Sequence, residues 1–188
     1  MKSKKYPYYV VLVLTLLMIV TRGSHFSGIS SLPEASWMIF MVAGLLFPIF
    51  SFIWFMSLAV AIDTYAFTFG GISGTCFSIA YGMLIPAYFS MWTAGRIAKA
   101  YVTGSILGYI AFFGLALCGT FVCELISSGS FYLWSGNFEP TLMEFFAREQ
   151  IYAPAMFATS AFWATAFVAM NTICRIYIKS RQAEVLTP

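Results

Sequence analysis

The sequence is poor in charged residues. Its 188 residues include 10 lysines and arginines, 7 aspartates and glutamates and one histidine, so only 9% are charged, whereas 61% are hydrophobic. A typical soluble domain carries about 25% charged residues. A chain with a mean hydropathy of +0.85 has too little polar surface to cover a water-soluble core. This shortage of charge excludes a soluble domain and predicts an integral membrane protein.

Several catalytic motifs are also absent. The chain contains no G-x-x-x-x-G-K-[ST] loop, so it does not hydrolyse nucleotides by that route. Its one histidine, His25, excludes an H-E-x-x-H zinc site and bis-histidine haem ligation, and no independent metal is expected. There is no basic stripe, so nucleic acid is not an expected partner. The pattern is that of a membrane protein in which lipid surrounds a few polar residues.

Long apolar runs, without the alternation typical of a transmembrane barrel, predict an all-α fold. A helix needs about 20 residues to cross the hydrocarbon core. Residues 35–69 are too many for one crossing, and Pro48 marks the expected break because proline removes a backbone donor. We therefore predict one domain over residues 1–188, a six-helix bundle with helices at about 6–21, 35–49, 51–69, 75–95, 101–127 and 152–178.

The N-terminal segment imitates a signal peptide, with lysines before an apolar run. No small-x-small cleavage site follows it, so residues 6–21 are expected to stay as the first helix. With six crossings and a cytoplasmic N-terminus, only Arg22 and Arg148 lie outside. Cytoplasmic segments favour lysine and arginine, and the other eight basic residues considered would lie there: Lys2, Lys4, Lys5, Arg96, Lys99, Arg175, Lys179 and Arg181. Both chain ends are therefore expected in the cytoplasm.

The same topology places most acidic residues toward the external face. Asp63 and Glu124 fall in the outer halves of the third and fifth helices, and Glu184 alone is cytoplasmic. Ionisable residues inside a membrane are costly and often functional. Asp63 is therefore a candidate site residue, with pairing to the Arg22 region or a neighbouring hydroxyl as the alternative. The external acidic residues are Glu34, Glu139, Glu144 and Glu149.

Cys76 ends a glycine-rich turn, Gly-Gly-Ile-Ser-Gly-Thr-Cys, at the expected start of the fourth helix. Unpaired backbone N–H groups at a helix start favour the thiolate, which is nucleophilic and binds soft metals. A free cysteine can equally be a small packing residue, as we expect for Cys118, Cys123 and Cys174. No C-x-x-C pair supports zinc or disulfide chemistry.

Three further polar residues have ordinary explanations when each is taken alone. Tyr81 has the character of a membrane-interface tyrosine. His25 lies in a loop and would be a surface histidine, and Arg148 can pair with Glu144 one helical turn away.

Taken in order, these residues resemble the BtuM-type vitamin B12 transporters, relatives of the S-components of energy-coupling-factor (ECF) transporters. The resemblance covers nearly the whole chain in length, helix count and residue order. It implies a multi-pass protein of the bacterial inner membrane that takes up cobalamin or a related corrinoid.

The resemblance further implies that base-off cobalamin binds in an external pocket, with Cys76 as the axial ligand of cobalt. His25, Asp63, Tyr81 and Arg148 would be the other pocket residues. A thiolate is a soft donor suited to transition metals. Its donation would weaken the bond on the opposite face of cobalt, so the resemblance also implies removal of the upper ligand (decyanation or dealkylation) that depends on Cys76.

One difference from the ECF relatives concerns partners. Their first helix usually presents an A-x-x-x-A surface to the energising ATPase module, whereas residues 8–20 contain neither alanine nor glycine. Small residues recur at four-residue spacing elsewhere, at Ala94 and Ala98 and at Gly104 and Gly108, where we expect internal helix packing. An ECF module is thus an open partner, and solitary transport after delivery by periplasmic or outer-membrane B12 proteins fits the sequence.

Two other functions remain open at the level of sequence. The first is an S-component for another vitamin, in which Cys76 only packs. The second is a membrane redox or quinone-associated subunit, suggested by 19% aromatic residues and four cysteines. The absence of paired histidines opposes the second.

Overall fold

The computed structural model describes residues 8–22, 32–69, 79–102, 104–136 and 141–186, and this part of the chain contains helices and no strand. His25 and Cys76 lie outside the described residues. The helices are α1 (Tyr8–Arg22), α3 (Ser36–Leu46), α4 (Phe50–Phe69), α5 (Ile79–Gly82), α6 (Leu84–Ala98), α7 (Ile106–Trp134) and α8 (Leu142–Leu186).

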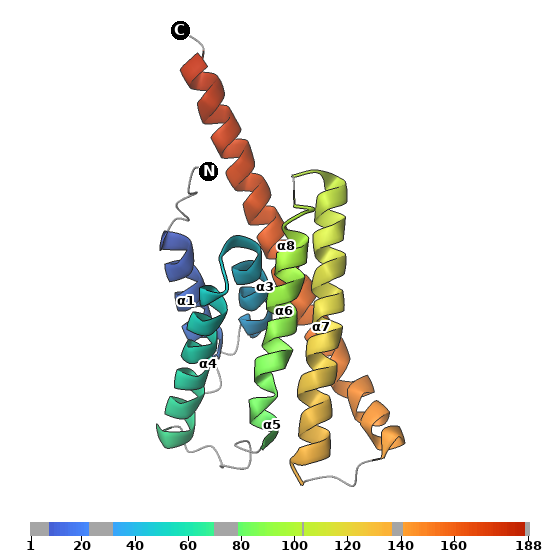
Figure 1. The fold of residues 1–188 in the computed structure, drawn as a ribbon. Coiled ribbons are helices and arrows are strands. Elements are labelled where there is room, and N and C mark those ends of the chain that lie inside the picture. Colours follow the sequence, from blue (N-terminus) through green and yellow to red (C-terminus); the bar gives the residue numbers. More distant parts are fainter. Residues whose placement is uncertain (1–7, 23–31, 70–78, 103, 137–140, 187–188) are drawn as a thin grey trace.

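When α5 and α6, which run in the same direction, are taken as one segment, successive helical segments run in alternating directions (Figure 1). The start of α1 and the end of α8 lie at the upper end of the bundle, together with the turn between α6 and α7. A contact supports this arrangement, because Arg175 Nη2 of α8 donates to the carbonyl of Val102, which follows α6 (3.5 Å). At the lower end of the bundle lie the end of α4, the short helix α5 and the start of α8.

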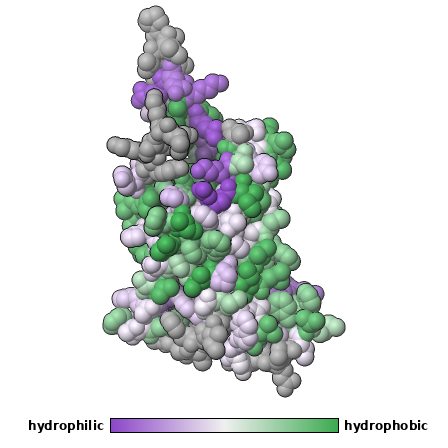
Figure 2. All heavy atoms as spheres, in the orientation of Figure 1, coloured by the Kyte–Doolittle hydropathy of each residue, from purple (hydrophilic) through white to green (hydrophobic). Residues whose placement is uncertain are grey.

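Within the described residues, three helices are long and apolar enough to cross a membrane: Phe50–Phe69, Ile106–Trp134 and Leu142–Gln182. Large apolar side chains on these helices and on α1 face outward, for example Leu12, Ile53, Val122 and Ile173. Figure 2 shows hydrophobic residues over the middle of the molecule and hydrophilic ones along the upper part of α8. A broad apolar exterior marks a surface made for lipid or protein rather than water. The fold is therefore that of an α-helical membrane protein.

Helix α3 forms the centre of the bundle. Residue 36 and residues 38–45 are buried, and the helix packs mainly on α6 while also meeting α1, α4, α7 and α8. Gly44 lies against the Trp92 backbone and Gly95 against the Met41 backbone, so a Cβ atom at either glycine would collide with a carbonyl group. Paired glycines let membrane helices approach closely, and here they bring the backbones of α3 and α6 together.

The small residues singled out in the sequence divide into two groups. Ala94 and Ala98 are buried in the core, and Ala94 faces Gly119 of α7, so these alanines serve internal packing as predicted. Gly104 and Gly108 also serve internal packing, because a Cβ atom at Gly108 would collide with the Tyr101 carbonyl and one at Gly104 with the Arg175 guanidinium. Gly104 has a φ of 90°, which favours glycine, and Gly108 donates its backbone N–H to the side chain of Ser105, the N-cap of α7.

The break at Pro48 is observed. Helix α3 ends at Leu46 and α4 begins at Phe50, and Ser51 Oγ donates to the Pro48 carbonyl (2.8 Å). Since proline is incompatible with the interior of a regular helix, this local rule located the boundary within a few residues.

Other predicted boundaries were wrong. The fourth helix was predicted over 75–95. The structure describes this segment from residue 79 as two helices, α5 and α6, which are separated at Met83, and α6 reaches Ala98. The fifth begins at Ile106 instead of 101, because Gly104 and the Ser105 cap start it there, and it extends to Trp134. The sixth runs over Leu142–Leu186 instead of 152–178, through Pro154. Hydropathy marks where a helix leaves the apolar layer, whereas polar ends of the same helix continue beyond it.

Candidate functional site

A buried charged cluster joins the end of α1 to three other helices. Arg22 is 7% exposed, and its Nε and Nη2 donate to the two carboxylate oxygens of Asp63 on α4, at 2.7 and 2.5 Å. Its Nη1 donates to Glu34 Oε1 (3.0 Å), Ser36 Oγ (3.1 Å) and Tyr88 Oη (2.7 Å). A buried guanidinium requires this kind of pairing, because an uncompensated charge in an apolar interior is very costly. We call these five residues the Arg22 cluster.

The pairing explains how an aspartate is tolerated in an apolar helix. Arg22 and Asp63 form a two-bond guanidinium–carboxylate pair, the geometry in which arginine binds carboxylates most strongly. The alternative given for Asp63, pairing with the Arg22 region, is thus what the structure shows. Asp63 lines neither of the two cavities described below.

Tyr81 connects the Arg22 cluster to a cavity. Its hydroxyl donates to Asp63 Oδ2 (2.7 Å), and its side chain forms part of the cavity wall. Among the described residues, Tyr81 is the one that links Asp63 to the cavity. The tyrosine has a role that its position near the membrane interface alone did not reveal.

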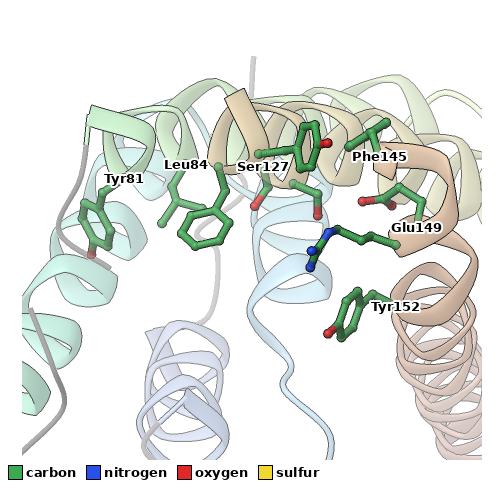
Figure 3. Close-up of a pocket in the computed structure, with 10 residues that line it drawn as sticks. Tyr81, Leu84, Ser127, Phe145, Glu149 and Tyr152 are labelled. Atoms are coloured by element: carbon green, nitrogen blue, oxygen red, sulfur yellow. The ribbon is translucent and has the colours of Figure 1, made fainter. Parts of the chain in front are cut away.

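The cavity has a volume of about 420 Å³ and lies among α5, α6, α7 and α8 at the lower end of the bundle. Figure 3 shows Tyr81 and Leu84 on one side, with Glu149 and Tyr152 of α8 on the other. We call it the lower cavity. Its lining mixes apolar and polar side chains, as ligand sites do: Tyr81, Leu84, Ser127, Ser128, Phe131, Tyr132, Phe145, Arg148, Glu149 and Tyr152.

No protein-family model and no curated protein matches this sequence.

Arg148 supplies positive charge to the lower cavity. Its Nε and Nη2 donate to Glu144 Oε1 at 3.2 and 2.9 Å, so the predicted pairing one helical turn apart is present. Both side chains are 39% exposed, and such a half-exposed pair contributes little to stability. The guanidinium is therefore held on the cavity wall by a partner on its own helix.

The buried carboxylate of Glu124 lies behind the wall of the lower cavity. Glu124 of α7 is 4% exposed and accepts a hydrogen bond from Ser128 Oγ (2.7 Å), and Ser128 lines the cavity. The sequence placed Glu124 in the outer half of its helix but not next to a cavity. Within the described residues, no group of three or more histidine, cysteine, aspartate or glutamate side chains is arranged to hold a metal ion.

The structure brings together the three predicted site residues that it describes. Tyr81 and Arg148 line one cavity, and Asp63 bonds to Tyr81. Sequence reasoning named Arg22 only as an alternative partner of Asp63, and it gave no site role to Tyr88 or Glu149. The available signals were Arg22 at the end of an apolar helix and Glu149 among aromatic residues. The residues that surround them lie on helices far apart in the sequence.

Proposed function

We propose that this chain is a bacterial inner-membrane uptake protein for cobalamin or a related corrinoid, binding its substrate from the outside. The observation that supports it is the convergence of Tyr81 and Arg148. The resemblance assigns both to the substrate site, and these residues from α5 and α8 line one cavity, with Asp63 bonded to Tyr81.

The proposal includes six membrane crossings with both chain ends in the cytoplasm. The alternating direction of the helical segments supports it (Figure 1). So does the contact of Arg175 with Val102, which puts the basic residues that follow α6 and those near the end of α8 at one end of the bundle. Arg148 and Glu144 begin α8 at the opposite end, where the substrate would enter.

Helix α3 crosses only part of the layer by itself. At 1.5 Å per residue its 11 residues span about 16 Å, against about 30 Å of hydrocarbon. Its burial by neighbouring helices makes this short length tolerable, because its ends meet protein rather than lipid. We therefore count α3 with the loop segments that flank it as one crossing.

In the proposed complex, Cys76 donates its thiolate to the cobalt of the substrate. Cys76 lies three residues before α5 and five before Tyr81. At about 3.6 Å per extended residue, the chain keeps the two Cα atoms within about 18 Å. Tyr81 and Arg148 would then hydrogen-bond polar groups of the bound corrinoid, and Asp63 would hold the Tyr81 hydroxyl.

Docking on an ATPase module is not part of the proposal. The outward face of α1 carries bulky apolar side chains, including Leu12, Val13, Leu16, Ile19 and Val20. Small residues, which allow close helix approach, are missing from that face. Solitary transport is the simpler proposal for this surface.

The test is the visible spectrum of protein purified after expression with cobalamin. Wild type should be coloured, with bands shifted from those of free cobalamin because sulfur ligates the cobalt. Cys76→Ala should lose the shifted bands, whereas Cys118→Ala, at an exposed cysteine of α7, should keep them. Identical spectra for wild type and Cys76→Ala would remove thiolate ligation, and colourless wild-type protein would favour an S-component for another vitamin.

A further inference from the structure

A second cavity lies between the start of α3 and the middle of α8. It has a volume of about 300 Å³ and does not share a residue with the lower cavity. We call it the α3–α8 cavity. Its lining is dominated by two tryptophans and two methionines, with one carboxylate: Pro33, Glu34, Trp37, Met38, Ala155, Met156, Thr159, Ser160 and Trp163.

The two indole rings form a rigid apolar wall. Trp163 Nε1 donates to the Pro33 carbonyl (3.2 Å), which fixes the polar edge of this ring against the segment before α3. Phe162 packs edge-to-face on the same ring, with centroids 5.1 Å apart. The faces of indole rings carry partial negative charge and attract cations. Trp37 contributes the second ring from α3.

The carboxylate of Glu34 gives this cavity a negative charge. Arg22 is shared between Glu34 and Asp63, so one positive charge meets two negative ones in the Arg22 cluster. The two-bond pair is with Asp63, whereas both hydrogen bonds to Glu34, from Arg22 and Ser36, end on Oε1. Oε2 accepts no hydrogen bond within the described part of the chain, and the Glu34 side chain is 40% exposed.

The remaining side chains add no positive charge. Ser160 is 2% exposed and is paired with Thr120 of α7 (2.6 Å), so its hydroxyl is already used. Met38 and Met156 supply polarisable apolar surface. The described lining thus combines one carboxylate, two indole rings and no basic side chain, which opposes an anion and favours a cation with apolar substituents.

We propose that the α3–α8 cavity binds an organic cation of the quaternary-ammonium class. The positive charge would lie between Glu34 and the faces of Trp37 and Trp163, and its methyl groups would contact Met38 and Met156. The ligand could come from solution or from the headgroup of a lipid with the same chemistry. This site is separate from the corrinoid proposal and does not depend on it.

Equilibrium dialysis of radiolabelled choline against the full-length protein, purified in a sugar-based detergent, tests the proposal. Choline should compete at least about tenfold better than 3,3-dimethylbutan-1-ol, its neutral isostere, because only choline carries the charge. This comparison uses wild-type protein and needs no variant. Equal competition by the two compounds, or no saturable choline binding, would overturn the proposal.

Variants then locate the binding. Glu34→Gln keeps an oxygen for Arg22 but removes the charge, and Trp163→Leu removes one ring; each should weaken choline binding about tenfold or more. Glu144→Gln and Trp134→Leu, which change the same residue types outside this cavity, should leave it unchanged. Binding that survives both cavity variants in folded protein would contradict the assignment.

A membrane arm distinguishes the two sources of the ligand. In phosphatidylglycerol nanodiscs, choline should bind as in detergent. If lipid headgroups occupy the cavity, phosphatidylcholine nanodiscs should abolish radiolabelled choline binding; if only soluble cations enter, binding should be equal in both. Either result identifies the source of the cation, whereas absence of binding in phosphatidylglycerol nanodiscs would refute the site in a membrane.

Discussion

At the scale of single residues, Arg22 determines how the polar interior is organised. It bonds side chains from α3, α4 and α6 as well as Glu34. A buried ion pair is weak evidence for net stability, but removing one partner leaves an unpaired charge that costs about 3–5 kcal/mol. The cluster therefore fixes the register of α1 against its neighbours more than it strengthens the fold.

Tyr81→Phe tests the link between this cluster and the lower cavity. The variant loses the hydrogen bond to Asp63, and the net value of such a bond is about 1 kcal/mol. We expect corrinoid affinity to fall about fivefold, as measured by spectrophotometric titration, with a small decrease in thermal stability.

Tyr109→Phe is the matched control. Tyr109 also donates its hydroxyl across the bundle, to Asn171 of α8 (3.0 Å), and accepts a hydrogen bond from Thr172 (3.3 Å), but lies outside the lower cavity. This variant should lose at least as much stability as Tyr81→Phe and keep wild-type affinity. Equal loss of affinity in the two variants would show that the effect comes from general loosening of the bundle rather than from the site.

The sequence indicated which residue types matter and suggested two pairings, Asp63 with the Arg22 region and Arg148 with Glu144, but not the other contacts of these residues. Asp63 could be singled out as a candidate site residue because a carboxylate in an apolar helix requires either a function or a stabilising partner. Its pairing with Arg22, 41 positions earlier, depends on the rotation and depth of two helices, which local patterns do not determine. The position of Glu149 and Ser128 on one cavity wall was hidden for the same reason.

At the scale of helices, the contact between α3 and α6 depends on two positions without side chains. A Cβ at Gly95 would meet the Met41 backbone, and one at Gly44 the Trp92 backbone. Because backbone cannot move away as a flexible side chain can, an added methyl group must push the helices apart.

Gly95→Ala should therefore lower stability by about 1–3 kcal/mol, the range for overpacked interiors. Thermal unfolding in detergent, followed by circular dichroism, measures the change. Gly114→Ala on α7 is the control, since nothing lies within 4 Å of a Cβ built there. It should be neutral or slightly stabilising, because alanine favours helix over glycine. Wild-type stability of Gly95→Ala would show that the helices are farther apart than described.

Helix positions were more predictable than helix ends. Pro48 acts through its own ring and missing N–H, so its effect can be seen in the sequence alone. The start of α8 at Leu142 instead of residue 152 depends on a weaker signal, the hydroxyl of Thr141 accepting from the Glu144 backbone (3.3 Å). Hydropathy, from which the helix bounds were predicted, does not mark a side-chain cap such as that of Thr141.

At the scale of the whole molecule, the two ends of the bundle differ in charge. Arg96, Arg175 and Arg181 lie toward one end, and Glu144 and Arg148 toward the other. Positively charged segments stay on the cytoplasmic side during membrane insertion. This asymmetry gives the proposed orientation.

Cysteine labelling in intact cells tests that orientation. In a cysteine-free background, Glu144→Cys should react with a membrane-impermeant maleimide, and Lys179→Cys should react only after the cells are opened. These two positions lie on the same helix, α8, on either side of its apolar stretch. Reaction of both in intact cells would contradict the six-crossing topology.

Tyr81 belongs at once to the Arg22 cluster and to the lower cavity. A solute that draws its hydroxyl inward must take that proton donor away from Asp63, and Arg22 is then the remaining hydrogen-bond partner of Asp63 among the described residues. Occupancy of the cavity would thereby be sensed at the last residue of α1, a helix none of whose described residues lines the cavity. A reporter group on α1 could therefore register loading from a distance.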